Sequence, residues 1–85
     1  MTSDSSAALI SFINTTYRPA SPVVADTELV RSEIVDSYSI LELISFIETR
    51  FAIRVPDEEV RPDNFRTVDA MSAMIAGARG ADDTA

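Results

Sequence analysis

The sequence predicts a small all-α fold, a four-helix bundle of three longer helices and one short helix with a long loop between the first two. In three separate segments apolar residues recur at three- and four-residue spacings, the pattern of a helix with one buried face. Residues that cap helices and residues that break them bound these segments. With 85 residues the chain has room for one domain with a modest core.

The first segment predicts a helix over about 4–17. Ser3 or Asp4 is available as the N-cap, and Pro19 and Pro22 end the helix. One apolar stripe runs along it, formed by Leu9, Ile10, Phe12, Ile13 and Tyr17.

A long connection over 18–36 follows, kept irregular by Pro, Ser and Asp residues. Leu29, Ile34 and Val35 are its candidate anchors to the core. A loop of this length in so small a domain favours a functional role.

The second helix is predicted over 37–51 and carries the strongest helical pattern in the chain. Its core face is formed by Ile40, Leu43, Ile44, Ile47 and Phe51. The opposite face carries Tyr38, Leu41, Glu42, Ser45, Glu48 and Thr49. Acids there lie beside two apolar side chains that the core does not need, which favours a docking surface. The alternative is that the two apolar residues are scattered surface residues, which are normal on any protein.

The last third of the chain predicts a short helical turn over 57–60 and a final helix over 68–76. Thr67 is the expected N-cap and Gly77 the expected end of this final helix. The expected core residues of this part are Ile53, Val55, Phe65, Val68, Met71, Met74 and Ile75. We therefore expect a single domain over 1–76 and a disordered tail over 77–85.

Composition excludes several classes of function. The formal charge is −7, so the phosphate backbone of a nucleic acid would repel the chain. Basic protein partners are favoured instead. The chain lacks His, Cys, Lys and Trp, and so lacks the usual general base, two common nucleophiles and most transition-metal ligands. We expect neither catalysis nor a metal site.

The N-terminus has no secretion or membrane signal, so a cytoplasmic protein is expected.

The segment VDSYSILELISFIETRFAIRVPDEE, together with NFRTVDAM, resembles the signature of acyl and peptidyl carrier proteins. In that family an Asp-Ser pair opens the second helix, and the serine carries 4'-phosphopantetheine. The resemblance covers roughly residues 9–75 and implies that Ser37 is the attachment site and Asp36 its preceding acid. It is nearer to discrete carriers of specialised-metabolite pathways and to D-alanyl carriers than to fatty-acid carriers.

This resemblance implies a carrier that holds an acyl or aminoacyl intermediate as a thioester. The expected pathway is natural-product biosynthesis of the polyketide or nonribosomal peptide type, such as antibiotic biosynthesis. We expect a freestanding carrier, because the chain begins with Met1 and has little outside the carrier unit, and we expect a monomer. Its prosthetic group would come from CoA. Its partners would be a phosphopantetheinyl transferase, a loading ligase or acyltransferase, and a downstream synthase or transferase. The expected partner-binding residues are Tyr38, Leu41, Glu42, Ser45 and Glu48.

Two departures from the family pattern bear on this interpretation. Tyr38 stands where the family usually has Leu or Met, which should alter partner choice more than attachment. The glycine often found shortly before the Asp is also missing, so the backbone there should differ.

A rival interpretation is an acidic helical adaptor that binds a basic partner. In that case Asp36 or Ser37 serves only as an N-cap, and Ser37 is never modified.

Overall fold

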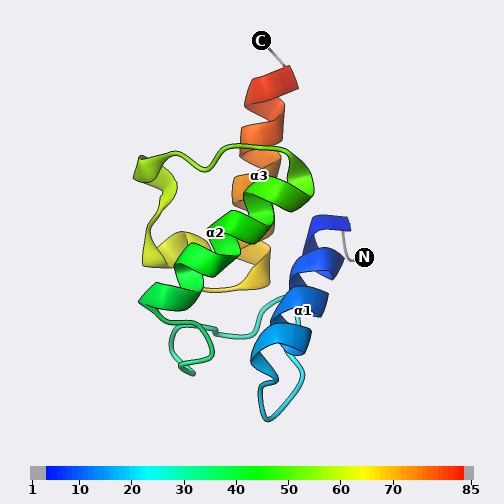
Figure 1. The fold of residues 1–85 in the computed structure, drawn as a ribbon, viewed down its shortest axis with the longest axis vertical. Helices are drawn as coiled ribbons and strands as arrows, with labels where there is room; N and C mark the ends of the chain where they lie inside the picture. The colour runs from blue at the N-terminus through cyan, green and yellow to red at the C-terminus, as the bar shows by residue number, and fades with distance from the viewer. Residues whose placement is uncertain (1–3, 84–85) are drawn as a thin grey trace.

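The protein is all-α, as predicted. The computed structural model describes residues 4–83, which form three α-helices and no strand (Figure 1). The helices are α1 (Asp4–Tyr17), α2 (Ser37–Phe51) and α3 (Val68–Asp83). Between α2 and α3 lie two 3-10 turns, η1 (Asp57–Glu59) and η2 (Pro62–Phe65). The predicted bounds of α1 and α2 are confirmed, whereas the predicted short helix over 57–60 is the 3-10 turn η1, and η2 was not predicted.

Local backbone chemistry sets the helix ends. Asp36 has an extended backbone (φ −119°, ψ −171°), and its carboxylate accepts the N–H of Ser39, which caps α2. At the other end, Ala52 turns into the left-handed region with φ 55°, and Arg18 does the same with φ 45° after α1. Thr67 caps α3 as predicted, because its Oγ1 accepts the N–H of Ala70 at 3.0 Å.

The predicted end of α3 at Gly77 is wrong. The helix continues through Gly77 to Asp83, and Gly77 does not adopt a positive φ. Each of the two glycines in AGARGA costs about 1 kcal/mol relative to alanine inside a helix, and the alanines and the arginine beside them are good helix formers. Residues 77–83 are thus helical rather than part of a disordered tail, and residues 84–85 lie outside the described part of the chain.

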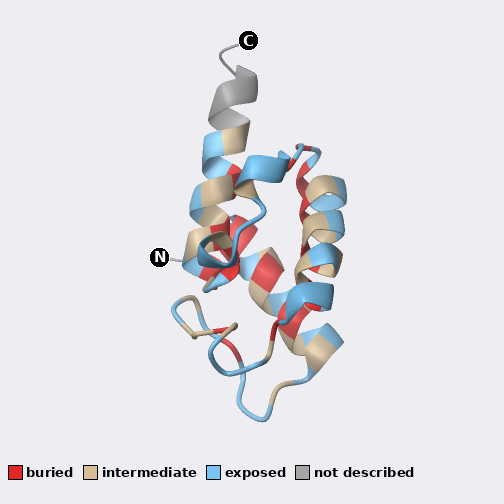
Figure 2. Cartoon of the chain, turned by 90° about the vertical axis from the view of Figure 1, so that its left-hand side faces the viewer, coloured by how far each residue is buried: buried red, intermediate tan, exposed pale blue. Residues whose placement is uncertain are grey.

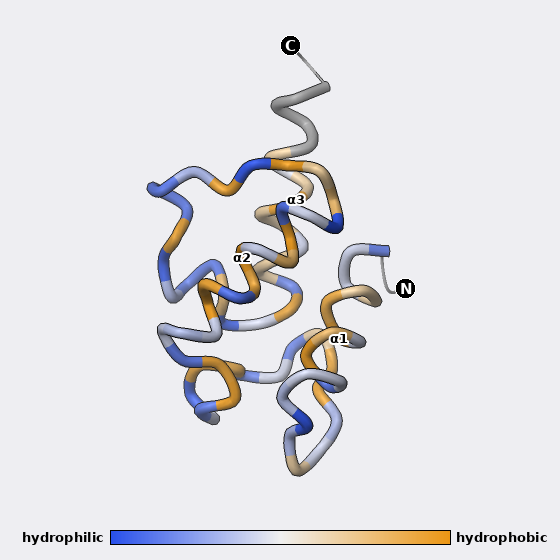
Figure 3. The backbone as a smooth tube through the Cα atoms, viewed as in Figure 1, coloured by the Kyte–Doolittle hydropathy of each residue, from blue (hydrophilic) through white to orange (hydrophobic). Residues whose placement is uncertain are grey.

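All three helices and the long loop contribute to one core (Figure 2). Along α2 the hydrophobic residues recur with each turn, as the sequence pattern requires (Figure 3). The predicted loop anchors Leu29 and Val35 are fully buried, and Val23 is a buried loop residue that the pattern missed. The other buried hydrophobic residues are Leu9, Ile13, Leu43, Ile47, Phe51, Ile53, Val55, Phe65, Val68, Met71 and Ile75.

Backbone hydrogen bonds hold the long loop against the end of the bundle. The N–H of Leu29 donates to the carbonyl of Arg66 at 2.8 Å, and the N–H of Asp69 donates to the carbonyl of Ala25 at 3.0 Å. Asn14 of α1 also accepts the N–H of Val23 at 2.8 Å. The loop therefore has a defined path, and it delivers the chain to the start of α2.

Side chains join the helices to one another. Between α1 and α2 the rings of Phe12 and Phe46 stack with centroids 4.2 Å apart, a favourable aromatic geometry. Between α1 and α3 the hydroxyls of Ser5 and Ser6 lie 3.0 and 2.7 Å from that of Ser72. These contacts fix α2, and hence its exposed side, relative to the rest of the bundle.

Candidate attachment site and docking face

Ser37 is the first residue of α2, and its side chain is exposed. The Oδ1 atom of the preceding Asp36 accepts the N–H of Ser39 at 2.9 Å. That hydrogen bond, followed by others at the same helix start, lowers the pKa of Asp36 below its ordinary value. The site is therefore an exposed primary hydroxyl beside an ionised, helix-capping carboxylate.

The first turn of a helix suits an attached phosphodiester. Its N–H groups are not used within the helix, and the positive end of the helix dipole lies there. The chain has no His and no Cys, and one oxygen of Asp36 is engaged by the helix backbone. The Ser37 hydroxyl thus has no His or Cys partner in this chain.

The turn before Asp36 forms without the glycine that the family often has there. Glu33 takes the left-handed conformation with φ 62°. The N–H groups of Ile34 and Val35 then both donate to the carbonyl of Leu29, at 3.0 and 3.1 Å. The left-handed conformation is sterically unfavourable for a residue other than glycine, and these two hydrogen bonds help to offset that cost.

Three of the five predicted partner-binding residues are freely accessible on α2. Tyr38 is 70% exposed, Leu41 is 63% exposed, and Ser45 is exposed. We refer to these three residues as the exposed trio. Tyr38 and Leu41 are among the few large apolar side chains left in solvent, a feature typical of interaction sites.

The two predicted docking acids are half-buried and bonded within the chain. Glu42 Oε1 accepts the hydroxyl of Tyr17 at 2.9 Å, and Glu48 Oε2 accepts the backbone N–H of Val55 at 2.9 Å. Burial, together with the hydrogen bond to Glu42, raises the pKa of Tyr17 to about 12. Both acids therefore hold the fold together, which the spacing of residues on α2 did not reveal.

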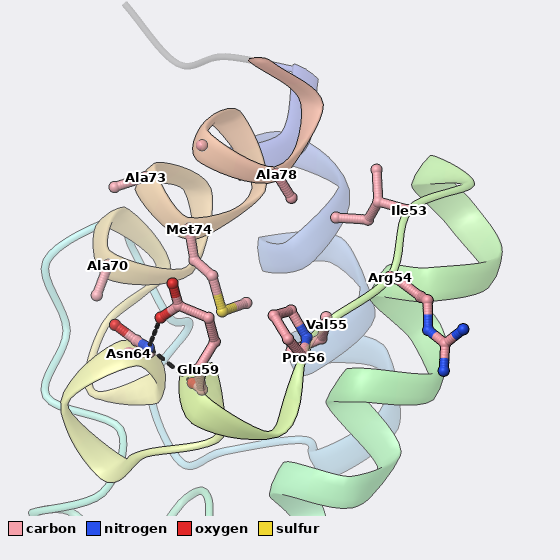
Figure 4. Close-up of a pocket in the computed structure, with 11 residues that line it drawn as sticks. Ile53, Arg54, Val55, Pro56, Glu59, Asn64, Ala70, Ala73, Met74 and Ala78 are labelled. Atoms are coloured by element: carbon pink, nitrogen blue, oxygen red, sulfur yellow. Dashed lines mark hydrogen bonds between the residues drawn. The ribbon is translucent and has the colours of Figure 1, made fainter. Parts of the chain in front are cut away.

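A surface hollow lies away from Ser37, between α3 and the segment that follows α2 (Figure 4). Its volume is about 730 Å³, and none of its lining residues comes from 36–52. Met74 extends from α3 toward Glu59 and Pro56 on the opposite wall. The hollow is not part of the attachment site.

Comparisons with known proteins identify the family. A curated acyl carrier protein from Kineococcus radiotolerans is 36% identical over 62 residues, which make up 73% of this chain and 74% of that protein. The chain belongs to the acyl carrier protein family. No family model matches the chain. Acyl carrier proteins are carriers rather than enzymes, in agreement with the prediction from composition.

Two further comparisons place this acyl carrier protein among its relatives. The "Probable acyl carrier protein PigG" of a Serratia species is 33% identical over 51 residues, 60% of this chain and 59% of the relative. A solved chain described as "Crystal structure of FAD-dependent dehydrogenase" superimposes with a TM-score of 0.72 at 28% identity. The match covers 80% of this chain and 99% of the solved one. Among the described helices of this carrier, none is long and apolar enough to cross a membrane.

Proposed function

We propose that this acyl carrier protein receives 4'-phosphopantetheine from CoA on Ser37. The observation that carries the proposal is an exposed serine at the first position of α2, directly after its N-cap Asp36, in a chain of this family. In the reaction Ser37 Oγ forms a bond to phosphorus, adenosine bisphosphate leaves, and the hydroxyl proton passes to a base of the transferase. When bound, the group supplies a terminal thiol that holds an acyl or aminoacyl intermediate as a thioester.

The residues around Ser37 fit this group. Its phosphodiester would lie at the positive end of α2, and the long arm would extend into solvent from an exposed position. Asp36 is turned toward the N–H of Ser39, which leaves the approach to the Ser37 hydroxyl open to a transferase.

The exposed trio is the proposed contact for partner enzymes, which include the transferase, a loading ligase or acyltransferase, and a downstream synthase or transferase. Apolar side chains that are free in solvent gain the most from burial in a partner, so Tyr38 and Leu41 are the proposed anchors. The cytoplasmic location and the monomeric state expected from the sequence stay predictions.

The pathway proposed is specialised metabolism. Support comes from the resemblance of the chain to discrete carriers of such pathways. The solved chain that is similar to this one bears the description "Crystal structure of FAD-dependent dehydrogenase". We propose a flavin-dependent dehydrogenase as one downstream partner, which would oxidise the intermediate while the carrier holds it.

Intact-mass measurement tests the carrier function. After incubation with CoA and a broad-specificity phosphopantetheinyl transferase, the parent chain should gain the mass of one phosphopantetheine group, and Ser37→Ala should gain none. A parent chain that stays unmodified while a control carrier is converted would favour the unmodified adaptor instead.

A further inference from the structure

The hydroxyl of Tyr17 reaches across from the end of α1 to the second helix. It donates to Glu42 Oε1 at 2.9 Å and lies 3.5 Å from the carbonyl oxygen of Ser39. The Tyr17 ring also contacts Phe12 edge to face, with centroids 6.1 Å apart. The side chain is therefore fixed at its ring and at its hydroxyl.

These contacts end on the turn that carries the attachment site. Ser39 is buried, its N–H is capped by Asp36, and its carbonyl lies beside the Tyr17 hydroxyl. Ser37 stands between Asp36 and Ser39, so this short segment is held by the cap on one side and by Tyr17 on the other.

We propose that Tyr17 is a positioning residue for the attachment site, whose hydroxyl fixes the first two turns of α2 against α1 and so sets how Ser37 is presented. This role rests on the proposed function of Ser37. It also explains why Glu42, an acid on the partner-facing helix, is half-buried: its carboxylate serves as the acceptor of this contact.

The high pKa of Tyr17, about 12, supports the same geometry, since the hydroxyl stays protonated and can donate at every pH at which partner enzymes work. The role differs from core packing. Leu9 and Ile13 of the same helix are fully buried, whereas Tyr17 is only half-buried, and its polar atom is the part that reaches α2.

The test compares Tyr17→Phe with Thr16→Val, which removes a hydroxyl from an exposed residue of the same helix. Two quantities are measured on each purified chain. One is hydrogen exchange at the amides of Ser39 and Ile40, and the other is kcat and KM for modification by a broad-specificity phosphopantetheinyl transferase with CoA. Ile47→Val serves as a stability control, because it weakens the core by about 1 kcal/mol without touching this turn.

Tyr17→Phe should raise exchange at both amides about fivefold, the effect of one lost hydrogen bond, and should lower kcat more than it raises KM. Thr16→Val should leave exchange and kcat unchanged, and Ile47→Val should leave kcat unchanged. Glu42→Gln keeps an Oε1 acceptor and should resemble the parent, whereas Glu42→Leu removes the acceptor and should resemble Tyr17→Phe.

The proposal is overturned if Tyr17→Phe matches Thr16→Val in exchange and in kcat, or if Ile47→Val lowers kcat as much as Tyr17→Phe does. If the parent chain is not modified at all, the proposed function fails, but exchange at Ser39 and Ile40 still reports whether Tyr17 holds the turn. The two failures are therefore distinguishable.

Discussion

The carboxylate of Glu48 accepts the backbone N–H of Val55 at 2.9 Å, which ties the last turns of α2 to the chain that leaves it. Val55 is buried, so its N–H has little access to water as an alternative partner. We predict that Glu48→Ala lowers the free energy of unfolding by about 1–3 kcal/mol, the cost of a buried donor without a partner.

Chemical denaturation checks this prediction, with Glu58→Ala as the control because Glu58 is an exposed acid of η1. The control should change stability by less than about 0.5 kcal/mol. Equal effects of the two substitutions would show that Glu48 is not a structural acid.

Leu41→Ala should slow modification by a broad-specificity transferase several-fold while leaving stability within about 0.5 kcal/mol, because the side chain is 63% exposed and packs little in the free carrier. Val24→Ala is the matched control, an apolar side chain that is 56% exposed in the long loop. Similar rates for Leu41→Ala, Val24→Ala and the parent would remove Leu41 from the docking face.

Asp36 should make the stability of the carrier depend on pH. Its pKa is lowered in the folded state, so its ionised form contributes stability above the unfolded pKa of about 3.9, and this contribution is lost as the pH falls through the lower folded pKa. Asp36→Asn retains a capping oxygen but does not ionise. The difference in denaturation midpoint between parent and variant should be constant at neutral pH and disappear in acid.

The control for this comparison is Asp26→Asn, at an exposed acid of the long loop. A difference between parent and Asp36→Asn that persists unchanged into strong acid would mean that the ionised cap contributes nothing.

Gly77→Ala tests whether α3 continues past its predicted end. Because Gly77 lies inside the helix and an added Cβ would meet nothing within 4 Å, alanine should raise the free energy of unfolding by about 0.5–1 kcal/mol. If Gly77 instead ended the helix in the left-handed conformation, alanine would lower stability, and thermal melts separate the two signs.

Apolar periodicity was sufficient to predict the helices, because the core is built from residues spaced for one face. Leu43 and Ile47 are fully buried as their spacing requires, and the capping residue Thr67 marked the start of α3. The prediction that α3 ends at Gly77 was wrong, because glycine occurs both after helix ends and at tolerated positions inside helices next to alanines.

The position of the Asp36-Ser37 pair at the start of α2 was predictable as a local motif, whereas the roles of the α2 acids were not. Glu42 and Glu48 have the spacing of a solvent-facing surface, but their hydrogen-bond partners, Tyr17 and Val55, belong to segments whose placement depends on the tertiary fold. Tyr17 was assigned to the apolar stripe of α1, and nothing in its spacing indicated that its hydroxyl reaches α2.

The central claim is that Ser37 carries the prosthetic group, and locating the modification within a peptide tests it most directly. Cleavage at arginine releases residues 32–50, which contain Ser32, Ser37, Ser39 and Ser45, so fragmentation that retains the labile phosphodiester is required to assign the site. After treatment with CoA and transferase, we predict that the added mass lies on Ser37 alone, and that Ser32→Ala and Ser45→Ala still gain it. Added mass on any other serine, or modification that persists in Ser37→Ala, would contradict the account.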